Sequence, residues 1–448
     1  MKKIFSIIAL FTLLVFYTGC DKLLDLEPAQ SISENIALDS DENVKNVLIG
    51  AYALFDEPGI YGGNLLRNCE LLAGDGEIQW VGTYIDPRQI FNKDMLTTNS
   101  EVYVQWRDSC AVINTANNIL SAINIVNEDD QDWVEGEALF LRGLMYFDMV
   151  RFFGLQYQPG VQNTQPGVPI VLTPTEGITD ASFVNRATVE EVYTQVIADL
   201  TAAASKLPLD NDVYASKGAA NALLARVYLQ KGDYASARDA ANTVIASGQY
   251  SLLPDYAEVF NQDDNTSEDI FATQITPQNR FSSMTEFFSI REYGGRDGDI
   301  EILNGHLSLY PAGDTRKDLF FLGSGAMRTG KWNNQYGVVN LIRLAEMYLI
   351  RAECNQRLGT SVGATPLADY NTIRSRAGLI PSGTVSLNNI LLERRLELAF
   401  EGHRIHDQRR LKENVGARPW NDPKLLFPIP ARELEANPKL KSQQNPGY

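Results

Sequence analysis

The stretch ERRLELAFEGHRIHDQRR, residues 393–410, combines two histidines with a row of acids. Imidazole and carboxylate groups are the side chains that general acid–base catalysis and metal coordination need. Three of the acids recur at every fourth residue, which places them on one face of a helix: Glu393, Glu397 and Glu401. The stretch is therefore a catalytic centre, a metal site or the charged side of a structural helix.

The spacing favours a structural helix. His403 continues an apolar stripe on one helical face, together with Leu392, Leu396 and Ala399. Its HxxH pattern lacks the spacing and the acid of the HExxH zinc motif. Like charges on one face are destabilising unless cations meet them, and four arginines of preceding helical segments are available: Arg343, Arg351, Arg374 and Arg376. We predict an ion network that holds the last helix on the scaffold, with His403 and His406 as packed residues.

Three other patterns approach known chemistry without completing it. GAMRTGKW, residues 325–332, has the spacing of a phosphate-binding loop, but Trp332 stands where Ser or Thr would bind magnesium. GTSVG, residues 359–363, has the spacing of a nucleophile elbow but lies between two helical segments. NQDDNTSED, residues 261–269, lacks the Gly and the final Glu of a calcium loop. We predict no catalytic residue, no metal and no cofactor.

The elements that carry these residues are mostly helices in pairs. GAANALLARVYLQKGDYASARDAANTVIAS, residues 218–247, has the small-residue and tyrosine spacing of a tetratricopeptide pair, joined at Gly232 and Asp233. The plan recurs around Ala345 and Tyr348, around Gly143 and Tyr146, and more weakly in NVLIGAYALF. The tyrosines are separated by 82 and 120 residues, whereas a regular array repeats every 34 or so.

The fold class that follows is mainly α, a tetratricopeptide-like scaffold of about four helix pairs with loop-rich insertions and a few short strands. Two insertions run over about 57–98 and 252–338. They are rich in Gly, Asp, Asn and aromatics, and a short strand is expected around 268–275. Insertions on a rigid scaffold are where binding loops usually lie.

The N-terminus is typical of a bacterial lipoprotein. A basic start and an apolar run over 4–18 form a signal sequence that is too short to span a membrane. It ends at Cys20, which resembles the acylated cysteine of a lipobox. We predict a signal peptide over 1–19, a lipidated N-terminus and tether over 20–40, and one domain over 41–448.

Charge and cysteine content exclude several classes of protein. The formal net charge of −17 argues against a nucleic-acid partner, because phosphate neutralisation needs clustered Lys and Arg. Cys69, Cys110 and Cys354 remain after Cys20, without the spacing of a zinc site and too few for a disulfide framework. Buried free thiols are expected.

A family resemblance rests on motifs that occur in a fixed order, mostly after residue 310. They are DTRKDLFF (314–321), Lys331-Trp332, LIRLAEMYLIRAE (341–353), DYNTIRSRAGL (369–379), LLERRLELAFEGHRIHDQRRL (391–411), LLFPIPARELEANPKL (425–440) and the terminal QNPGY. Together with the lipobox and FLRGLMYFDMVRFFG (140–154), the sequence resembles the SusD/RagB family of surface lipoproteins. The resemblance implies capture of oligosaccharides without catalysis, and delivery to a partner SusC-like TonB-dependent transporter in the outer membrane.

A sugar site needs flat aromatic platforms with polar side chains at their edges. The two insertions contain both types of side chain, and the resemblance places ligand contacts in these regions. The candidate ligand-binding residues are Arg67, Asn68, Asp75, Trp80, Tyr84, Tyr293, Arg296, Trp332 and Tyr336. Capture of peptides or another nutrient by the same scaffold, a protein-binding adaptor facing the periplasm and, least favoured, a hydrolase stay open as alternatives.

Overall fold

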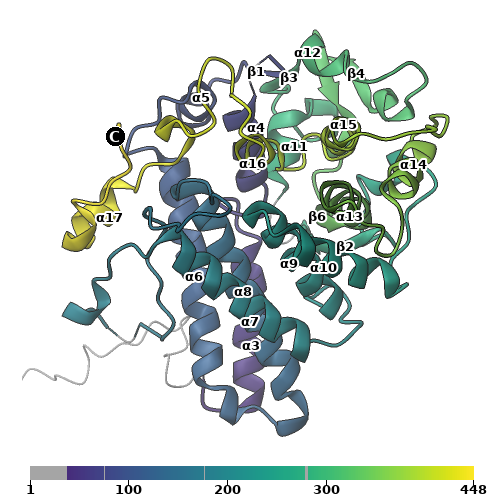
Figure 1. The fold of residues 1–448 in the computed structure, drawn as a ribbon. Helices are drawn as coiled ribbons and strands as arrows, with labels where there is room; N and C mark the ends of the chain where they lie inside the picture. The colour runs from purple at the N-terminus through teal and green to yellow at the C-terminus, as the bar shows by residue number, and fades with distance from the viewer. Residues whose placement is uncertain (1–37, 75, 176, 278–280) are drawn as a thin grey trace, which may run out of the picture.

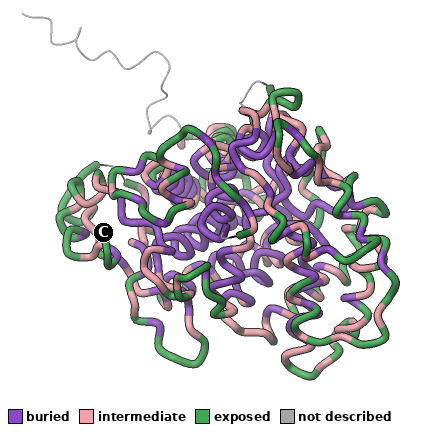
Figure 2. Tube along the Cα trace, turned by 90° about the horizontal axis from the view of Figure 1, so that it is seen from above, coloured by how far each residue is buried: buried purple, intermediate pink, exposed green. Residues whose placement is uncertain are grey.

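The computed structural model describes residues 38–448 apart from 75, 176 and 278–280 (Figure 1). The predicted lipid site Cys20, the signal peptide and most of the tether therefore lie outside the described residues. One large apolar cluster extends from α3 to the C-terminal segment, and Figure 2 shows it as a buried interior under an exposed periphery of loops. Within the described part of the chain, no helix combines the length and hydropathy needed to cross a bilayer.

Helices dominate the fold, which confirms the predicted class. In chain order they are α3 (Asp41–Phe55), α4 (Asn64–Ala73), α5 (Ile85–Asn92), α6 (Ser100–Ser121), α7 (Glu128–Phe153), α8 (Val189–Lys206), α9 (Lys217–Lys231), α10 (Tyr234–Ala246), α11 (Ser283–Phe288), α12 (Asn304–Leu307), α13 (Leu344–Leu358), α14 (Pro366–Arg376), α15 (Leu387–Glu397), α16 (Arg404–Arg410) and α17 (Ala431–Ala436). The strands are β1 (Ile78–Trp80), β2 (Asp269–Thr273), β3 (Ile300–Ile302), β4 (Phe320–Gly323), β5 (Ala326–Thr329) and β6 (Val339–Arg343).

Helices α3, α6, α7 and α8 run side by side as a layer of long helices, in the lower part of Figure 1. Nearly all of α7 from Gly136 onward is buried. Small residues permit this close packing: a Cβ added at Gly143 would lie 3.1 Å from the side chain of Leu200 on α8. Gly143, which lies at a predicted small-residue position of the repeat, is therefore a point of close contact between α7 and α8.

The predicted helix pairs form where the spacing indicated. Gly232 ends α9 in the left-handed conformation, and the Asp233 side chain accepts a hydrogen bond from the Ser236 backbone N–H at the start of α10. Helices α13 and α14 form the later pair, and Ala225 and Ala345 are fully buried in their helices. Removal of apolar surface from water drives this stacking, because neither helix of a pair can cover its own apolar face.

The strands of the described residues form three short antiparallel ladders, two of which join distant segments of the chain, while β4 and β5 form a local hairpin. β1 pairs with β3, β2 with β6 and β4 with β5. The register of the first ladder places Trp80 opposite Ile300, and that of the second places Asp269 opposite Arg343. The strand expected around 268–275 is confirmed as β2, and the ladders bring both insertions against the helical scaffold.

Three local expectations were wrong. The first insertion, expected to be rich in loops, contains the helices α4 and α5, and every residue of α4 from Leu65 to Ala73 is buried. The helix over 392–403 is interrupted after α15, where Phe400 and Gly402 have positive φ angles of 64° and 81°. His403 therefore belongs to a separate helix start, not to the stripe of Leu392. Cys69 and Cys354 are buried free thiols as expected, but Cys110 is exposed.

Candidate ligand-binding surface

The β1–β3 ladder brings the two insertions together. Beyond Trp80, the backbone N–H of Val81 donates to the carbonyl of Asp299 at 2.8 Å, so the two chains stay in contact after the ladder ends. Three residues further from the ladder on each side lie Tyr84, at the start of α5, and Arg296. Residues more than 200 positions apart in the sequence thus meet at one surface.

Tyr84 and Arg296 form the centre of this surface. The Arg296 guanidinium carbon lies 3.8 Å from the centroid of the Tyr84 ring, and the group donates to the Tyr84 hydroxyl. It also donates to Thr83 Oγ1 at 3.2 Å and to Asp299 Oδ2 at 3.1 Å. The Tyr84 side chain is 43% exposed. A guanidinium has five N–H donors, so N–H groups remain beside an exposed ring edge.

Two further aromatic side chains of the second insertion face solvent. Tyr293 is 37% exposed and contacts Phe321 edge to face, with ring centroids 5.9 Å apart. Phe281 is 47% exposed. Within the described residues, Tyr84, Phe281 and Tyr293 are the exposed aromatic side chains, and all three belong to the predicted insertions.

Three predicted contacts lie beneath this surface as supports. Arg67, Asn68 and Trp80 are all buried. The ring of Phe287 on α11 contacts two of these residues and Tyr84. Its centroid is 4.3 Å from the Arg67 guanidinium, 5.8 Å from the Trp80 ring and 6.1 Å from the Tyr84 ring.

Arg67 binds internal partners, with Nη2 2.6 Å from Glu101 Oε2 and 2.8 Å from Asn68 Oδ1. In this structure Arg67, Asn68 and Trp80 do not face solvent, and Arg67 and Trp80 share with Tyr84 a contact to the Phe287 ring. Phe287 is a residue that the sequence reasoning missed, because its neighbours in the sequence do not indicate which distant side chains its ring contacts.

Trp332 and Tyr336 do not join Tyr84 and Arg296. Trp332 is buried against Phe260 and donates from Nε1 to the Phe400 carbonyl at 3.2 Å. Tyr336 is half-buried and follows Gln335, whose side chain packs against the turn after Tyr293. Asp75 lies outside the described residues.

The predicted ion network is present and buried. Arg343 Nη1 lies 2.6 Å from Glu397 Oε1 and 2.9 Å from Glu268 Oε1, and its Nε lies 2.7 Å from Glu401 Oε2. The Lys331 ammonium lies 2.6 Å from Glu401 Oε1. The remaining contacts of the glutamate row are to Arg316, Arg374 and Arg376, whereas Arg351 pairs with Asp369 instead.

The network shifts the pKa of its members in opposite directions. Burial lowers the pKa of Lys331 to about 8, although the charge of Glu401 opposes this shift. Burial by itself raises the pKa of Glu401, but the charges of Arg343 and Lys331 outweigh it and lower the pKa. The network is therefore a set of buried charges that depend on one another.

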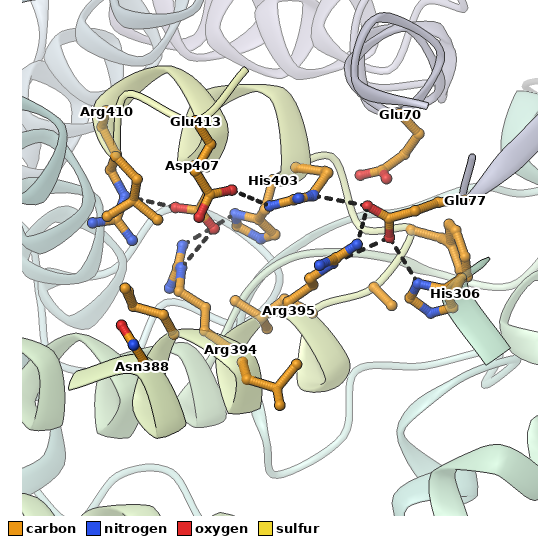
Figure 3. A pocket seen from close by; sticks show the side chains of 17 residues that line it. Glu70, Glu77, His306, Asn388, Arg394, Arg395, His403, Asp407, Arg410 and Glu413 are labelled. Carbon is orange, nitrogen blue, oxygen red and sulfur yellow. Dashed lines mark hydrogen bonds and ion pairs between the residues drawn. The ribbon is translucent and has the colours of Figure 1, made fainter. Parts of the chain in front are cut away.

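The two histidines of the opening motif are packed residues. His406 is buried between Phe152, at a ring distance of 5.4 Å, and Cys69 Sγ at 3.3 Å. His403 directly precedes α16 and lines a cavity (Figure 3), and burial lowers its pKa to about 3, so the ring is neutral at physiological pH. Within the residues that the structure describes, no group of three or more His, Cys, Asp or Glu is placed to hold a metal ion.

Comparison with known proteins finds the same family in both halves of the chain. Residues 22–229 match a family model described as starch-binding and associating with the outer membrane, and residues 320–422 match the model of the SusD family. SusD-like protein P2 of Formosa agariphila is 27% identical, over 98% of this chain and 99% of its own length. SusD-like protein P38 of the same organism is 24% identical over the whole of both chains.

Solved structures agree with the family at the level of the fold. A crystal structure of a SusD superfamily protein from Bacteroides thetaiotaomicron superposes with a TM-score of 0.80 at 26% identity, covering 91% of this chain and all of that one. The surface glycan-binding protein A of Bacteroides uniformis superposes with a TM-score of 0.76 over 91% of this chain and 99% of that one. At 20% identity, the second likeness concerns the fold alone.

Proposed function

Because the chain belongs to the SusD/RagB family of glycan-binding proteins, we propose that it captures oligosaccharides at the cell surface and delivers them to a SusC-like TonB-dependent outer-membrane transporter. A lipid on Cys20 anchors it to the outer membrane, and the protein itself catalyses no reaction. The ligand site is the surface around Tyr84, Arg296 and Tyr293.

One observation carries this proposal: the exposed aromatic side chains of the described residues all lie in the two insertions, and none lies on the helix pairs. Sugar rings offer apolar C–H faces and many hydroxyls, which match aromatic rings with polar groups at their edges. At Tyr84 the ring and the N–H donors of Arg296 stand within contact of each other. An open surface of this kind buries little ligand area, so modest affinity is expected.

A binding experiment tests the site directly. A glycan array identifies a ligand, and calorimetry compares wild type with Tyr84→Ala and Arg296→Gln. We expect each variant to weaken binding at least about tenfold, since each removes a stacking or charge-assisted contact. Tyr234→Ala is the matched control, because Tyr234 is a half-buried tyrosine of the α10 scaffold that packs against Arg357. Unchanged affinity in both site variants would remove the assignment, and binding of peptides in place of glycans would change the ligand class.

The anchor and the partner need separate tests. Cys20→Ala is expected to release the protein from the outer-membrane fraction, and added protease is expected to cleave the wild-type protein on intact cells. Affinity purification from solubilised outer membranes should recover a TonB-dependent transporter in stoichiometric amounts. Protection of the protein in intact cells, with only periplasmic proteins recovered, would favour the protein-binding adaptor.

A further inference from the structure

A cavity of about 220 Å³ lies among α4, α15 and α16, and none of the three exposed aromatic residues lines it (Figure 3). Four guanidinium groups contribute to its wall: Arg394, Arg395, Arg404 and Arg410. Leucine side chains of α15 and Leu411 form apolar parts of the lining. The cavity is smaller than a site for a drug-sized ligand, which leaves room for one compact molecule.

Two of the acids in the wall are already engaged by protein cations. Glu77 accepts from His306 Nδ1 at 2.9 Å, contacts Arg395 at 2.5 Å and accepts from Arg404 Nε at 3.1 Å. Figure 3 shows Glu77 between Arg395 and His306. Asp407 accepts from Arg394 Nε at 2.9 Å and from Arg410 Nε at 2.7 Å. These carboxylates have little capacity left to bind a ligand donor.

Several N–H donors of the wall, in contrast, remain available. Arg404 contacts Glu77 through Nε and Glu413 through Nη1, which leaves its Nη2 for another acceptor. Both contacts of Arg395 use Nε and Nη2, which leaves its Nη1 for another acceptor. Arg394 Nη2 lies 3.5 Å from His403 Nδ1, and a guanidinium can only donate. Nδ1 of the neutral His403 ring is therefore the acceptor, and Nε2 carries the proton.

Glu70 adds a carboxyl group that is held by a backbone amide. Its Oε1 accepts from the Gly402 backbone N–H at 2.9 Å, and burial raises its pKa to about 7. Near neutral pH this group is partly protonated, so it adds less than one full negative charge to a wall whose four guanidinium groups are each paired with a carboxylate. It can also exchange a hydrogen bond with a hydroxyl group in either direction.

We propose that this cavity binds a small organic carboxylate of the size of one sugar residue, with a hexuronate as the ligand class. Arg395 and Arg404 supply donors for the carboxylate, which guanidinium groups bind through charge-assisted hydrogen bonds. His403 Nε2 and Glu70 face hydroxyl groups, and the leucines cover the carbon skeleton. A bare inorganic anion would leave the apolar wall unused, and a peptide terminus would bring N–H donors to a wall in which Glu77 and Asp407 already accept from protein cations. The site is separate from Tyr84, so it does not depend on the glycan capture proposed above.

Calorimetry on the full-length protein in detergent tests the proposal, with sodium D-glucuronate as the probe. We expect saturable 1:1 binding, at least about tenfold weaker binding of D-glucose, which lacks the carboxylate, and weaker binding of phosphate and N-acetylalanine. Arg395→Gln should weaken glucuronate binding at least about tenfold. Leu392→Trp, which fills the rim of the cavity without removing a charge, should abolish it. Arg418→Gln is the matched control, because Arg418 pairs with Asp422 at 2.9 Å outside the cavity.

The outcomes separate the alternatives. Absence of saturable glucuronate binding, equal binding of glucose, or unchanged binding in Leu392→Trp would overturn the proposal. If phosphate binds as tightly as glucuronate, the cavity is an inorganic-anion site. If N-acetylalanine binds more tightly than glucuronate, the cavity binds peptide termini. Both results reject a hexuronate as the ligand. If Arg395→Gln does not fold, Leu392→Trp decides. Tyr84→Ala should keep glucuronate binding while losing glycan capture, which distinguishes the two proposals.

Discussion

The surroundings of Arg343 and Arg296 contain the same kinds of groups in two very different settings. Each arginine contacts a carboxylate and lies near an aromatic ring. Arg343 lies 2.6 Å from Glu397 and 5.8 Å from the centroid of the Tyr256 ring. Arg296 lies 3.1 Å from Asp299 and 3.8 Å from the centroid of the Tyr84 ring. The side chain of Arg343 is 2% exposed, whereas that of Arg296 is 30% exposed. Burial, not residue type, separates them.

The difference has a physical cause. A buried charge has lost its hydration, so removal of one partner leaves the others uncompensated in a medium of low dielectric constant. At the surface, water and salt replace a lost partner at small cost. The first group is therefore coupled to folding, while the second is free to exchange its partners for a ligand. The following predictions test this contrast.

The largest effect is expected for Arg343→Met. This substitution leaves Glu268, Glu397 and Glu401 buried without their shared cation, and breaking such a group typically costs about 3–5 kcal/mol. Denaturant unfolding measures the loss of free energy of unfolding. Arg418→Met, which removes an exposed pair, is the control and should cost about 1 kcal/mol or less. Similar values for the two variants would contradict the contrast.

An intermediate, pH-dependent effect is expected for Glu77→Gln. Burial by itself raises the pKa of Glu77, but the hydrogen bond from His306 and the charges of Arg404 and Arg395 outweigh it and lower the pKa from 4.5 to about 2. The unfolded chain therefore binds the proton more readily than the folded one, so the carboxylate stabilises the fold above pH 4.5 and loses this contribution as the pH falls towards 2.

We expect Glu77→Gln to be less stable than wild type by roughly 2 kcal/mol at neutral pH. The difference should narrow steadily in unfolding curves recorded at decreasing pH below about 5. A difference that stays constant with pH would show that Glu77 acts by packing and not by charge.

The smallest effect on stability is expected for Tyr84→Ala. The cation–π contact with Arg296 is partly exposed, and contacts of this kind contribute about 0.5–1 kcal/mol. The free energy of unfolding should therefore fall by about 1 kcal/mol or less, although we expect glycan binding to weaken. Cooperative loss of structure in this variant would mean that Tyr84 is a structural residue like Trp332.

The candidate site was predictable in kind but not residue by residue. Loop composition pointed to both insertions, and the exposed Tyr84 and Tyr293 were among the residues selected. Trp80 and Trp332 were selected on the same signal but are buried. The sequence around a tryptophan in a glycine-rich segment is the same whether the ring is exposed or buried. Burial depends on contacts with Phe287 or Phe260, which are distant in the sequence.

The row of Glu393, Glu397 and Glu401 illustrates the same limit in the scaffold. The three glutamates lie on one helical face, so their like charges need cationic partners. The expected arginines Arg343, Arg374 and Arg376 are among these partners. Arg316 and Lys331 come from the second insertion and carried no such signal. The break of the helix after α15 was also missed, because Phe400 is not a residue that ordinarily marks a left-handed turn.

By itself the sequence determined the helix pairs, their caps and the position of the insertions, since these depend on local periodicity and on residues a few positions apart. Only the tertiary structure decided which aromatic rings face solvent, which cations meet the glutamate row and where the cavity beside His403 lies. Those features depend on the β1–β3 and β2–β6 ladders, which join segments separated by many residues. Pairing at that range is a property of the packed chain and not of any local pattern.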